Sequence, residues 1–307
     1  MNGLGEVVQE YLSVRRALGY KLEREGMLLP GFAAFAEAQE SPHLTTELAL
    51  QWVTQPVDAS PDCLSRRLGM VRRFALHVSA LDPRTEVPPA DLIPHRKRPR
   101  HQPYLYTDAD VRALMQACTG LRGPLRPSTY ATLIGLLAVT GMRVGEAIAL
   151  DRSDLDPGEQ VLIIRHSKFN KSREVPLHST TWEALGAYAR NRDGVLRRPR
   201  SASFFLSQAG TRLLTQNVWA TFSRLRRWAG LTGQPRPPRI HDLRHSFALN
   251  AILRWYREGV EVEPRIARLS TYLGHVSPSS TYWYLTATPE LLRLAAQRVE
   301  RKGGETS

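Results

Sequence analysis

Cysteine is scarce in this sequence. Of its 307 residues only Cys63 and Cys118 are cysteines, and they lie far apart and outside any Cys-x-x-Cys spacing. Two isolated thiols cannot form a disulfide framework, and they do not give the ligand spacing of a structural zinc site. The shortage fits a reducing compartment, so we expect a cytoplasmic protein.

Long apolar runs are also missing. The first twenty residues include Glu6, Glu10, Arg15 and Arg16, so we expect no signal peptide. The most apolar stretch, residues 132–140, is too short to span a bilayer. It is predicted to be a buried helix, and no membrane partner is expected.

Acidic residues are outnumbered. The sequence has 42 Lys and Arg against 29 Asp and Glu, a formal net charge of +13, and its pI is about 10.2. Such a surplus indicates a polyanionic partner, most commonly nucleic acid. An anionic membrane surface or a ribosomal assembly would fit the same charge. Arginine dominates the basic clusters, and its planar guanidinium suits bidentate binding of phosphate.

Residues 1–90 are predicted to form a small helical domain. Apolar residues recur there at helical spacing in four groups, which favours four short amphipathic helices. The last group also carries four arginines, which either line DNA or form a solvated face: Arg66, Arg67, Arg72 and Arg73.

Residues 91–103 are predicted to be an extended basic linker. Prolines interrupt this stretch and oppose helix formation, and residues 95–101 form a basic run. Such a linker either follows DNA phosphates electrostatically or serves only as a soluble tether.

Residues 104–307 are predicted to form a second, mixed α+β domain. Thr107 is a candidate helix cap with acidic residues after it, and helices follow to about Leu150. Two strands, residues 161–164 and 174–177, flank a polar hairpin tip, and further helices begin near residues 181, 215, 241 and 288. The expected fold is therefore mainly α with a small β-sheet.

Four short segments in this second part suggest a common chemistry. They contain Arg143 in residues 140–146, Lys168 in the hairpin, His241 and Arg244 in residues 241–247, and His275 with Tyr284 nine residues later. Singly, each has an ordinary structural explanation. Together they supply what phosphodiester exchange needs: cations for the phosphate oxygens, a nucleophile, and groups that move protons.

This set of segments resembles the tyrosine recombinases of the phage integrase family. Residues 140–146 match the family's T-G-x-R-x-x-E pattern, and residues 167–177 match its lysine-bearing hairpin, with Ser167 in place of a glycine. Residues 241–248 match H-x-L-R-H-[ST]-[FC]-A, and residues 273–275 match L-G-H with the tyrosine at the family's interval.

The resemblance implies a role for each candidate residue. Tyr284 would attack the scissile phosphate and form a 3′-phosphotyrosine, with Lys168 as the general acid for the leaving 5′ oxygen. His241 would assist proton transfer at the tyrosine. Arg143, Arg244 and His275 would hold the non-bridging oxygens, and Glu146 would orient Arg143. No metal ion, nucleotide or other cofactor is implied.

The resemblance also implies an architecture and partners. Residues 1–90 would be a core-binding domain that binds DNA, and residues 104–307 the catalytic domain. Four subunits would assemble on paired sites in double-stranded DNA, alone or with partner recombinases. Two alternatives remain open, namely a type IB topoisomerase-like enzyme and a non-catalytic DNA-binding accessory protein.

Overall fold

The computed structural model describes residues 3–94, 102–165, 172–232, 236–274, 279–282, 284 and 289–304. The chain divides into two compact units, residues 1–100 and residues 101–307. Among the described residues, no helix is both long and apolar enough to cross a membrane.

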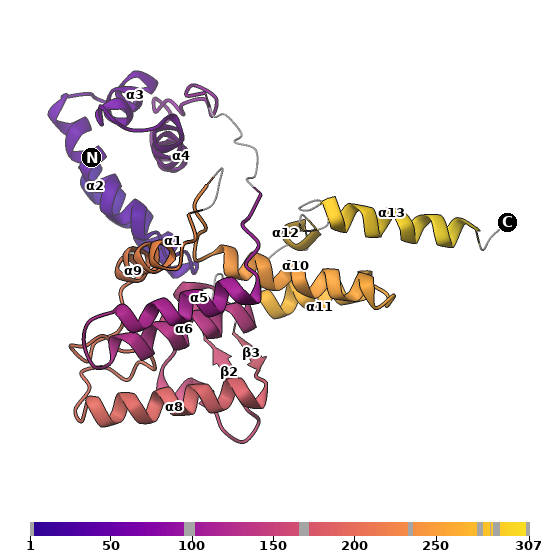
Figure 1. The fold of residues 1–307 in the computed structure, drawn as a ribbon. Coiled ribbons are helices and arrows are strands. Elements are labelled where there is room, and N and C mark those ends of the chain that lie inside the picture. The colour runs from indigo at the N-terminus through magenta and orange to yellow at the C-terminus, as the bar shows by residue number, and fades with distance from the viewer. Residues whose placement is uncertain are drawn as a thin grey trace. The chain divides into compact units, whose positions relative to one another are not determined.

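The first unit is helical in its described part (Figure 1), with helices α1 (Leu4–Ala17), α2 (Glu23–Ala38), α3 (Thr46–Thr54) and α4 (Pro61–Val78). The Thr45 and Ser60 side chains cap α3 and α4 by accepting backbone N–H groups. Phe32 lies at the centre of the core, with ring centroids 5.3 Å from Trp52 and 6.4 Å from Phe74. The four predicted helices are confirmed.

Two of the α4 arginines have structural partners. The Arg67 guanidinium lies over the Trp52 ring, 3.8 Å from its centroid, and donates to the Trp52 carbonyl at 3.0 Å. Arg73 forms an ion pair with Glu25 of α2 at 3.3 Å. These arginines help to hold the helices together, so a solvated face is not the whole account of them.

The second unit is a helical domain with one small sheet. Its helices are α5 (Asp108–Ala117), α6 (Arg126–Thr140), α7 (Val144–Ala149), α8 (Ser179–Val195), α9 (Thr215–Trp228), α10 (Asp242–Arg257), α11 (Glu263–Leu273), α12 (Ser279–Tyr282) and α13 (Pro289–Gly304). Single 3₁₀ turns occur at Cys118–Gly120 and Arg152–Asp154.

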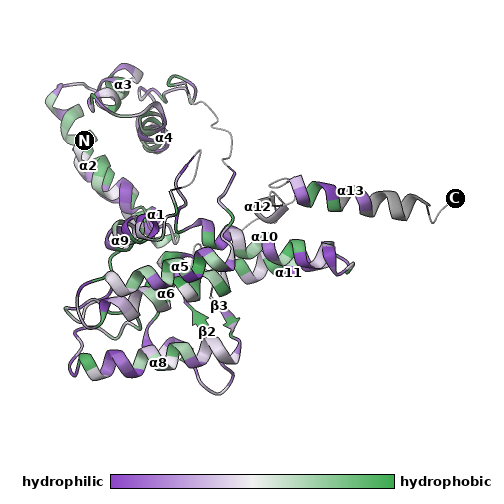
Figure 2. Cartoon of the chain, viewed as in Figure 1, coloured by the Kyte–Doolittle hydropathy of each residue, from purple (hydrophilic) through white to green (hydrophobic). Residues whose placement is uncertain are grey.

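The sheet is antiparallel, with strand order β1 (Leu155–Asp156), β2 (Val161–Ile164) and β3 (Arg173–Pro176). Leu162 of β2 pairs with Val175 of β3, and both side chains are buried. Figure 2 shows that β2 is hydrophobic. The predicted fold class, mainly α with a small β-sheet, is confirmed. The two-residue strand β1 was not predicted, because it is too short to give an alternating pattern.

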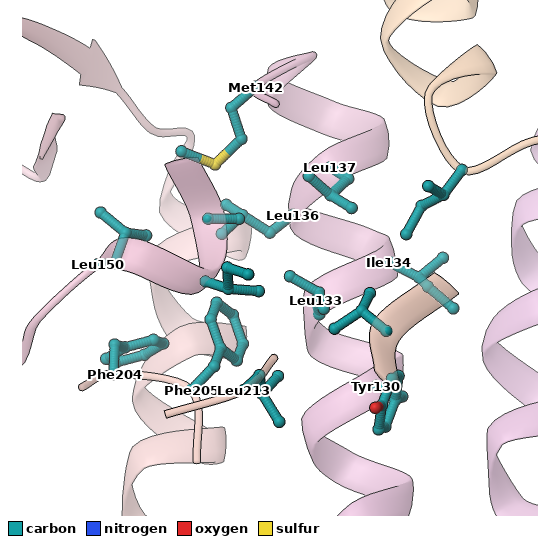
Figure 3. Packing of buried hydrophobic residues seen from close by; sticks show 14 of the residues in the cluster. Tyr130, Leu133, Ile134, Leu136, Leu137, Met142, Leu150, Phe204, Phe205 and Leu213 are labelled. Atoms are coloured by element: carbon teal, nitrogen blue, oxygen red, sulfur yellow. The ribbon is translucent and has the colours of Figure 1, made fainter. Parts of the chain in front are cut away.

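Helix α6 runs through the main core of the second unit. Leu133, Ile134 and Leu137 of α6 pack in one cluster with the aromatic side chains of Phe204 and Phe205 (Figure 3). The apolar stretch at residues 132–140 is therefore a buried helix, as predicted. The helix ends directly at the glycine turn that carries Arg143, so the core fixes the position of that turn.

A second apolar cluster joins α10, α11 and α13. Leu291 of α13 is fully buried in it, and Glu290 forms an ion pair with Arg257 of α10 at 2.6 Å. Tyr284 lies in the same cluster. This packing attaches the segment that carries Tyr284 to α10, the helix that carries Arg244.

Candidate active site

Arg143 lies in the tight turn between α6 and α7. Gly141 ends α6 with a φ of 60°, in the left-handed region that glycine adopts without steric cost. A Cβ atom at this position would lie 2.5 Å from the Phe247 ring. The turn thus requires glycine for both its backbone angle and its space. Arg143 follows as the N-cap residue of α7, with 29% of its side chain exposed.

A single buried carboxylate binds two arginines beside this turn. Glu146 accepts from Arg143 Nη1 at 2.8 Å and from both terminal nitrogens of Arg173, at 3.1 and 2.8 Å. Burial alone would raise the pKa of Glu146, but the hydrogen bonds and charges of Arg173 and Arg143 bring it below its usual value. Glu146 is therefore ionised, and it fixes both guanidinium groups.

Arg244 connects three segments of the chain. Its side chain is buried, with Nη1 donating to the Gly141 carbonyl at 2.9 Å and Nη2 donating to the Leu273 carbonyl at 2.7 Å. Burial and the nearby charge of Arg143 lower the pKa of Arg244 to about 10. The guanidinium remains protonated at neutral pH, so the region holds three arginine charges against one carboxylate.

Tyr284 is buried, with 2% of its surface exposed. Its hydroxyl oxygen lies 2.9 Å from Nδ1 of His245. Burial raises the pKa of the Tyr284 phenol, whereas the positive charges of Arg244 and Arg143 act in the opposite direction. The two arginines therefore lie close enough to stabilise negative charge on this oxygen.

His245 was not among the residues that the sequence predicted for the site. Burial, followed by the neighbouring His241, lowers the pKa of His245 to about 4. The ring is consequently neutral at pH 7, and it can accept a proton. Its position could have been noticed in the sequence, because residues four apart share a helix face and His245 is four residues after His241.

His241 lies at the start of α10 and is stacked edge-to-face on His245, with ring centroids 4.8 Å apart. Partial desolvation by the surrounding protein, followed by the charge of Arg244, lowers the pKa of His241. Part of the residue is nevertheless exposed to solvent. The His245 ring therefore lies between His241 and the Tyr284 hydroxyl.

The neighbouring Tyr282 lies in a different environment. It is the last residue of α12 and is 44% exposed, whereas Tyr284 is almost fully enclosed. The two tyrosines, although two residues apart, therefore differ strongly in burial. The assignment of Tyr284 as the nucleophile stays a prediction.

Two predicted site residues, Lys168 and His275, lie outside the described residues. Gly274, the last described residue before His275, accepts from Arg143 Nη2 at 3.1 Å through its carbonyl. The described residues bring Arg143, Arg244 and Tyr284 together with His245. Among them, no group of three or more His, Cys, Asp or Glu side chains could hold a metal ion.

The start of α10 is held by a buried hydrogen-bond network. Ser246 Oγ accepts from the Tyr106 N–H at 2.8 Å and lies 2.9 Å from the Asp242 carbonyl. The Tyr106 hydroxyl donates to the Arg239 carbonyl at 3.1 Å. This chain segment before α5 thus braces the turn that presents His241, Arg244 and His245.

The chain is similar in sequence to known proteins. Residues 105–290 match the model of the phage integrase family. Over 98% of both chains, the sequence is 45% identical to a Sinorhizobium fredii protein named as an integrase/recombinase, y4rB. It is 34% identical to the tyrosine recombinase XerD of Mycobacterium tuberculosis, over 63% of this chain and 60% of that protein.

Solved structures show the same fold. The Tn1549 transposon integrase in complex with transposon right end DNA matches 98% of this chain and 99% of its own, with a TM-score of 0.65 and 16% identity. A lambda integrase dimer bound to a core site matches 90% of this chain and 96% of its own, with a TM-score of 0.57 and 20% identity. The chain belongs to the phage integrase family, and it is a tyrosine-type site-specific DNA recombinase.

Proposed function

We propose that the chain cuts and rejoins double-stranded DNA through a 3′-phosphotyrosine formed on Tyr284. The observation that carries this proposal is the convergence of Arg143, Arg244 and Tyr284 from three distant segments of the sequence. Their electrostatic coupling supports a phenol that develops negative charge while the arginines bind the same phosphate.

The arginines supply the charge that the transition state needs. Both arginines are held in place before DNA binds: Arg143 by Glu146 and the Gly274 carbonyl, and Arg244 by two backbone carbonyls. Cations that are fixed in advance need no reorganisation when charge develops on the phosphate. His275 is proposed as a third group on the non-bridging oxygens, on the basis of the sequence motif.

The proton of the nucleophile passes to His245 in this proposal. The Tyr284 oxygen attacks phosphorus, its proton moves to His245 Nδ1, and the bond from phosphorus to the 5′ oxygen breaks. Lys168 gives a proton to that leaving oxygen. We assign the acceptor role to His245 instead of His241 because Nδ1 of His245 lies 2.9 Å from the Tyr284 hydroxyl. Reversal of these steps rejoins the strand.

We further propose DNA as the partner of both units, with four subunits assembled on paired sites. The proteins named above support the DNA partner, since two relatives are named as recombinases, one structural neighbour is in complex with transposon right end DNA and another is bound to a core site. The assembly of four subunits is proposed from the sequence resemblance. The helical first unit is proposed as the core-binding domain, residues 91–103 as a basic linker and residues 104–307 as the catalytic domain. The location is proposed to be the cytoplasm.

Covalent capture tests the chemistry with random DNA, so that no target site has to be chosen. The chain is incubated with a pool of random-sequence duplexes nicked near their centre. Cleavage close to the nick releases a short fragment that diffuses away, so the strand cannot be rejoined and the covalent adduct persists. DNA that remains bound after denaturation is then sequenced. We expect the wild-type chain and Tyr282→Phe to capture DNA through a phosphotyrosine, and Tyr284→Phe to capture none.

Tyr282→Phe is the matched control, since it removes a tyrosine hydroxyl only two residues from Tyr284. Capture by Tyr284→Phe but not by Tyr282→Phe would reverse our assignment of the nucleophile. Capture by neither the wild-type chain nor Tyr282→Phe would reject covalent catalysis. Plasmid relaxation without exchange between two captured sites would instead favour a type IB topoisomerase-like activity.

A further inference from the structure

A pocket of about 320 Å³ lies beside His241, outside the arginine cluster. One wall is formed by α9 and the other by the segment that leads into α10. Its volume is within the range of pockets that bind small ligands. Nothing in the proposed strand cleavage uses this pocket.

The α9 wall presents an exposed aromatic side chain. Trp219, Phe222 and Arg226 are spaced three, four and seven residues apart, so they share one face of the helix. Phe222 is buried and forms part of the floor, whereas Trp219 is 57% exposed at the rim. A large apolar ring left in water at a pocket entrance is a suitable surface on which a planar ligand can stack.

The rim is positively charged. Within the part of the chain that the structure describes, the Arg226 side chain makes no hydrogen bond or ion pair. Arg239 on the opposite wall binds the buried Asp242 at 2.9 Å, but its side chain is 58% exposed. Both guanidinium groups can therefore meet an anion that enters between the walls. Aromatic stacking combined with a phosphate-binding rim is characteristic of nucleotide recognition.

The pocket adjoins the reacting atoms. His241 lines it, and the His241 ring is 4.8 Å from the His245 ring, whose Nδ1 lies 2.9 Å from the Tyr284 hydroxyl. A ligand in the pocket would thus lie next to the phosphate that Tyr284 attacks. The DNA substrate brings planar, phosphate-bearing groups to this place.

We propose that the pocket binds one unpaired nucleobase of the DNA, close to the cleaved phosphate. The base stacks against Trp219 and Phe222, and its phosphate is held by Arg226 and Arg239. A base that has already lost its pairing partner enters at least cost, because no pair has to be broken. The inference rests on the proposed function, since it places substrate DNA beside Tyr284.

Two DNA hairpins that differ in one nucleotide test the proposal. One is a fully paired, fluorescein-labelled duplex, and the other carries a single unpaired thymine. The wild-type chain is expected to bind the bulged hairpin roughly tenfold more tightly in fluorescence anisotropy, which is the effect of one stacked base. Trp219→Ala should remove this preference, so that the two hairpins bind alike.

Trp228→Ala is the matched control, since Trp228 lies on the same helix, is 51% exposed and does not line the pocket. It should keep the wild-type preference. A second measurement replaces the unpaired thymine by 5-iodouracil and maps the photocross-link, which is expected at Trp219. Equal binding of both hairpins by the wild-type chain, or equal losses in the two tryptophan variants, would overturn the proposal. A cross-link outside the pocket would do the same.

These assays need no strand cleavage, so their outcome is independent of covalent capture. If the chain forms the Tyr284 adduct but shows no preference for the bulged hairpin, only the base pocket is rejected. If it shows the preference but forms no adduct, the pocket stands and the proposed chemistry fails.

Discussion

At the scale of single residues, the buried carboxylate of Glu146 sets the charge of the site. It accepts hydrogen bonds from Arg143 and Arg173, and it is one carboxylate among three arginines. Neutralising it would leave two guanidinium groups without their anionic partner in a poorly solvated place. The net positive charge would rise, but the geometry that aims Arg143 would be lost.

We therefore expect Glu146→Gln to lower the free energy of unfolding by about 3 kcal/mol and to reduce covalent capture of DNA. Urea unfolding and adduct yield measure the two effects. Glu159→Gln, which changes an exposed carboxylate on the β1–β2 turn, is the matched control and should alter neither. A Glu146→Gln protein with wild-type stability and adduct yield would show that the carboxylate does not hold the arginines.

His245 should make the protein sensitive to acid. Its folded pKa of about 4 lies below the ordinary value of 6.5. Between these two pH values, His245 binds a proton in the unfolded chain but not in the folded one. Stability is consequently lost as pH falls from about 6.5 to about 4, by up to about 3 kcal/mol. Urea unfolding at pH values across this window should show a smaller loss in His245→Gln than in the wild type.

His241→Gln is measured in parallel, because the pKa of His241 is lowered as well and adds to the same loss. Identical pH dependence in His245→Gln and the wild type would mean that the His245 ring is not enclosed as described. Near pH 7 the His245 ring is neutral, so the form that can accept the proton of Tyr284 is the populated one there.

The sequence predicted these residues unevenly. Arg143, Arg244 and Tyr284 could be found because their neighbours form motifs with fixed spacing. The contact between His245 and Tyr284 could not, since it depends on how the segment after α12 packs against α10. The two hydrogen bonds from Arg173 to Glu146 join a strand and a helix that are distant in the sequence, so no local sequence pattern could predict them.

At the scale of elements, α10 depends on the segment that precedes α5. Ser246 and Tyr106 connect the two through buried hydrogen bonds, and the Tyr106 hydroxyl reaches the Arg239 carbonyl. The sequence predicted where both helices begin, α5 from the Thr107 cap and α10 near residue 241, and both starts are confirmed. The sequence could not reveal the hydrogen bond from the Tyr106 N–H to Ser246, because a single contact between distant residues leaves no pattern in the sequence.

We expect Ser246→Ala to destabilise the protein by about 1 to 3 kcal/mol, since the buried Tyr106 N–H loses its acceptor. The rate of adduct formation should fall more than DNA affinity, because α10 positions the groups that we propose to act on the phosphate. Single-turnover capture and anisotropy separate the two quantities. Ser270→Ala, a comparably buried serine of α11, serves as the control, and equal effects in both variants would contradict a specific brace.

At the scale of the whole molecule, the excess of positive charge should govern DNA binding. The formal net charge is +13, and each phosphate that the protein neutralises releases counterions. Affinity should therefore fall steeply as salt is added. The basic run at residues 95–101 lies outside the described residues, so its part in this effect remains a prediction from sequence.

Replacing Arg96, Lys97, Arg98 and Arg100 by alanine should flatten the plot of log affinity against log salt by roughly 3 to 4 units if each residue meets one phosphate. Anisotropy titrations over a range of salt measure the slope. A control with the same change in charge replaces four exposed arginines of the second unit, namely Arg190, Arg197, Arg198 and Arg200. Equal slopes in the two variants would indicate an effect of net charge alone.

The bridge made by Arg244 also bears on when the enzyme becomes active during synthesis. Its two hydrogen bonds reach Gly141 and Leu273, and Tyr284 follows later still. A ribosome releases the chain from its amino end, so the first unit can fold while the second is unfinished. If the first unit binds DNA as proposed, the nascent protein can bind DNA before the phosphate-binding arginines and Tyr284 are in place. With Tyr284 as the proposed nucleophile, ribosomes stalled before residue 284 would yield chains that bind DNA and do not cut it.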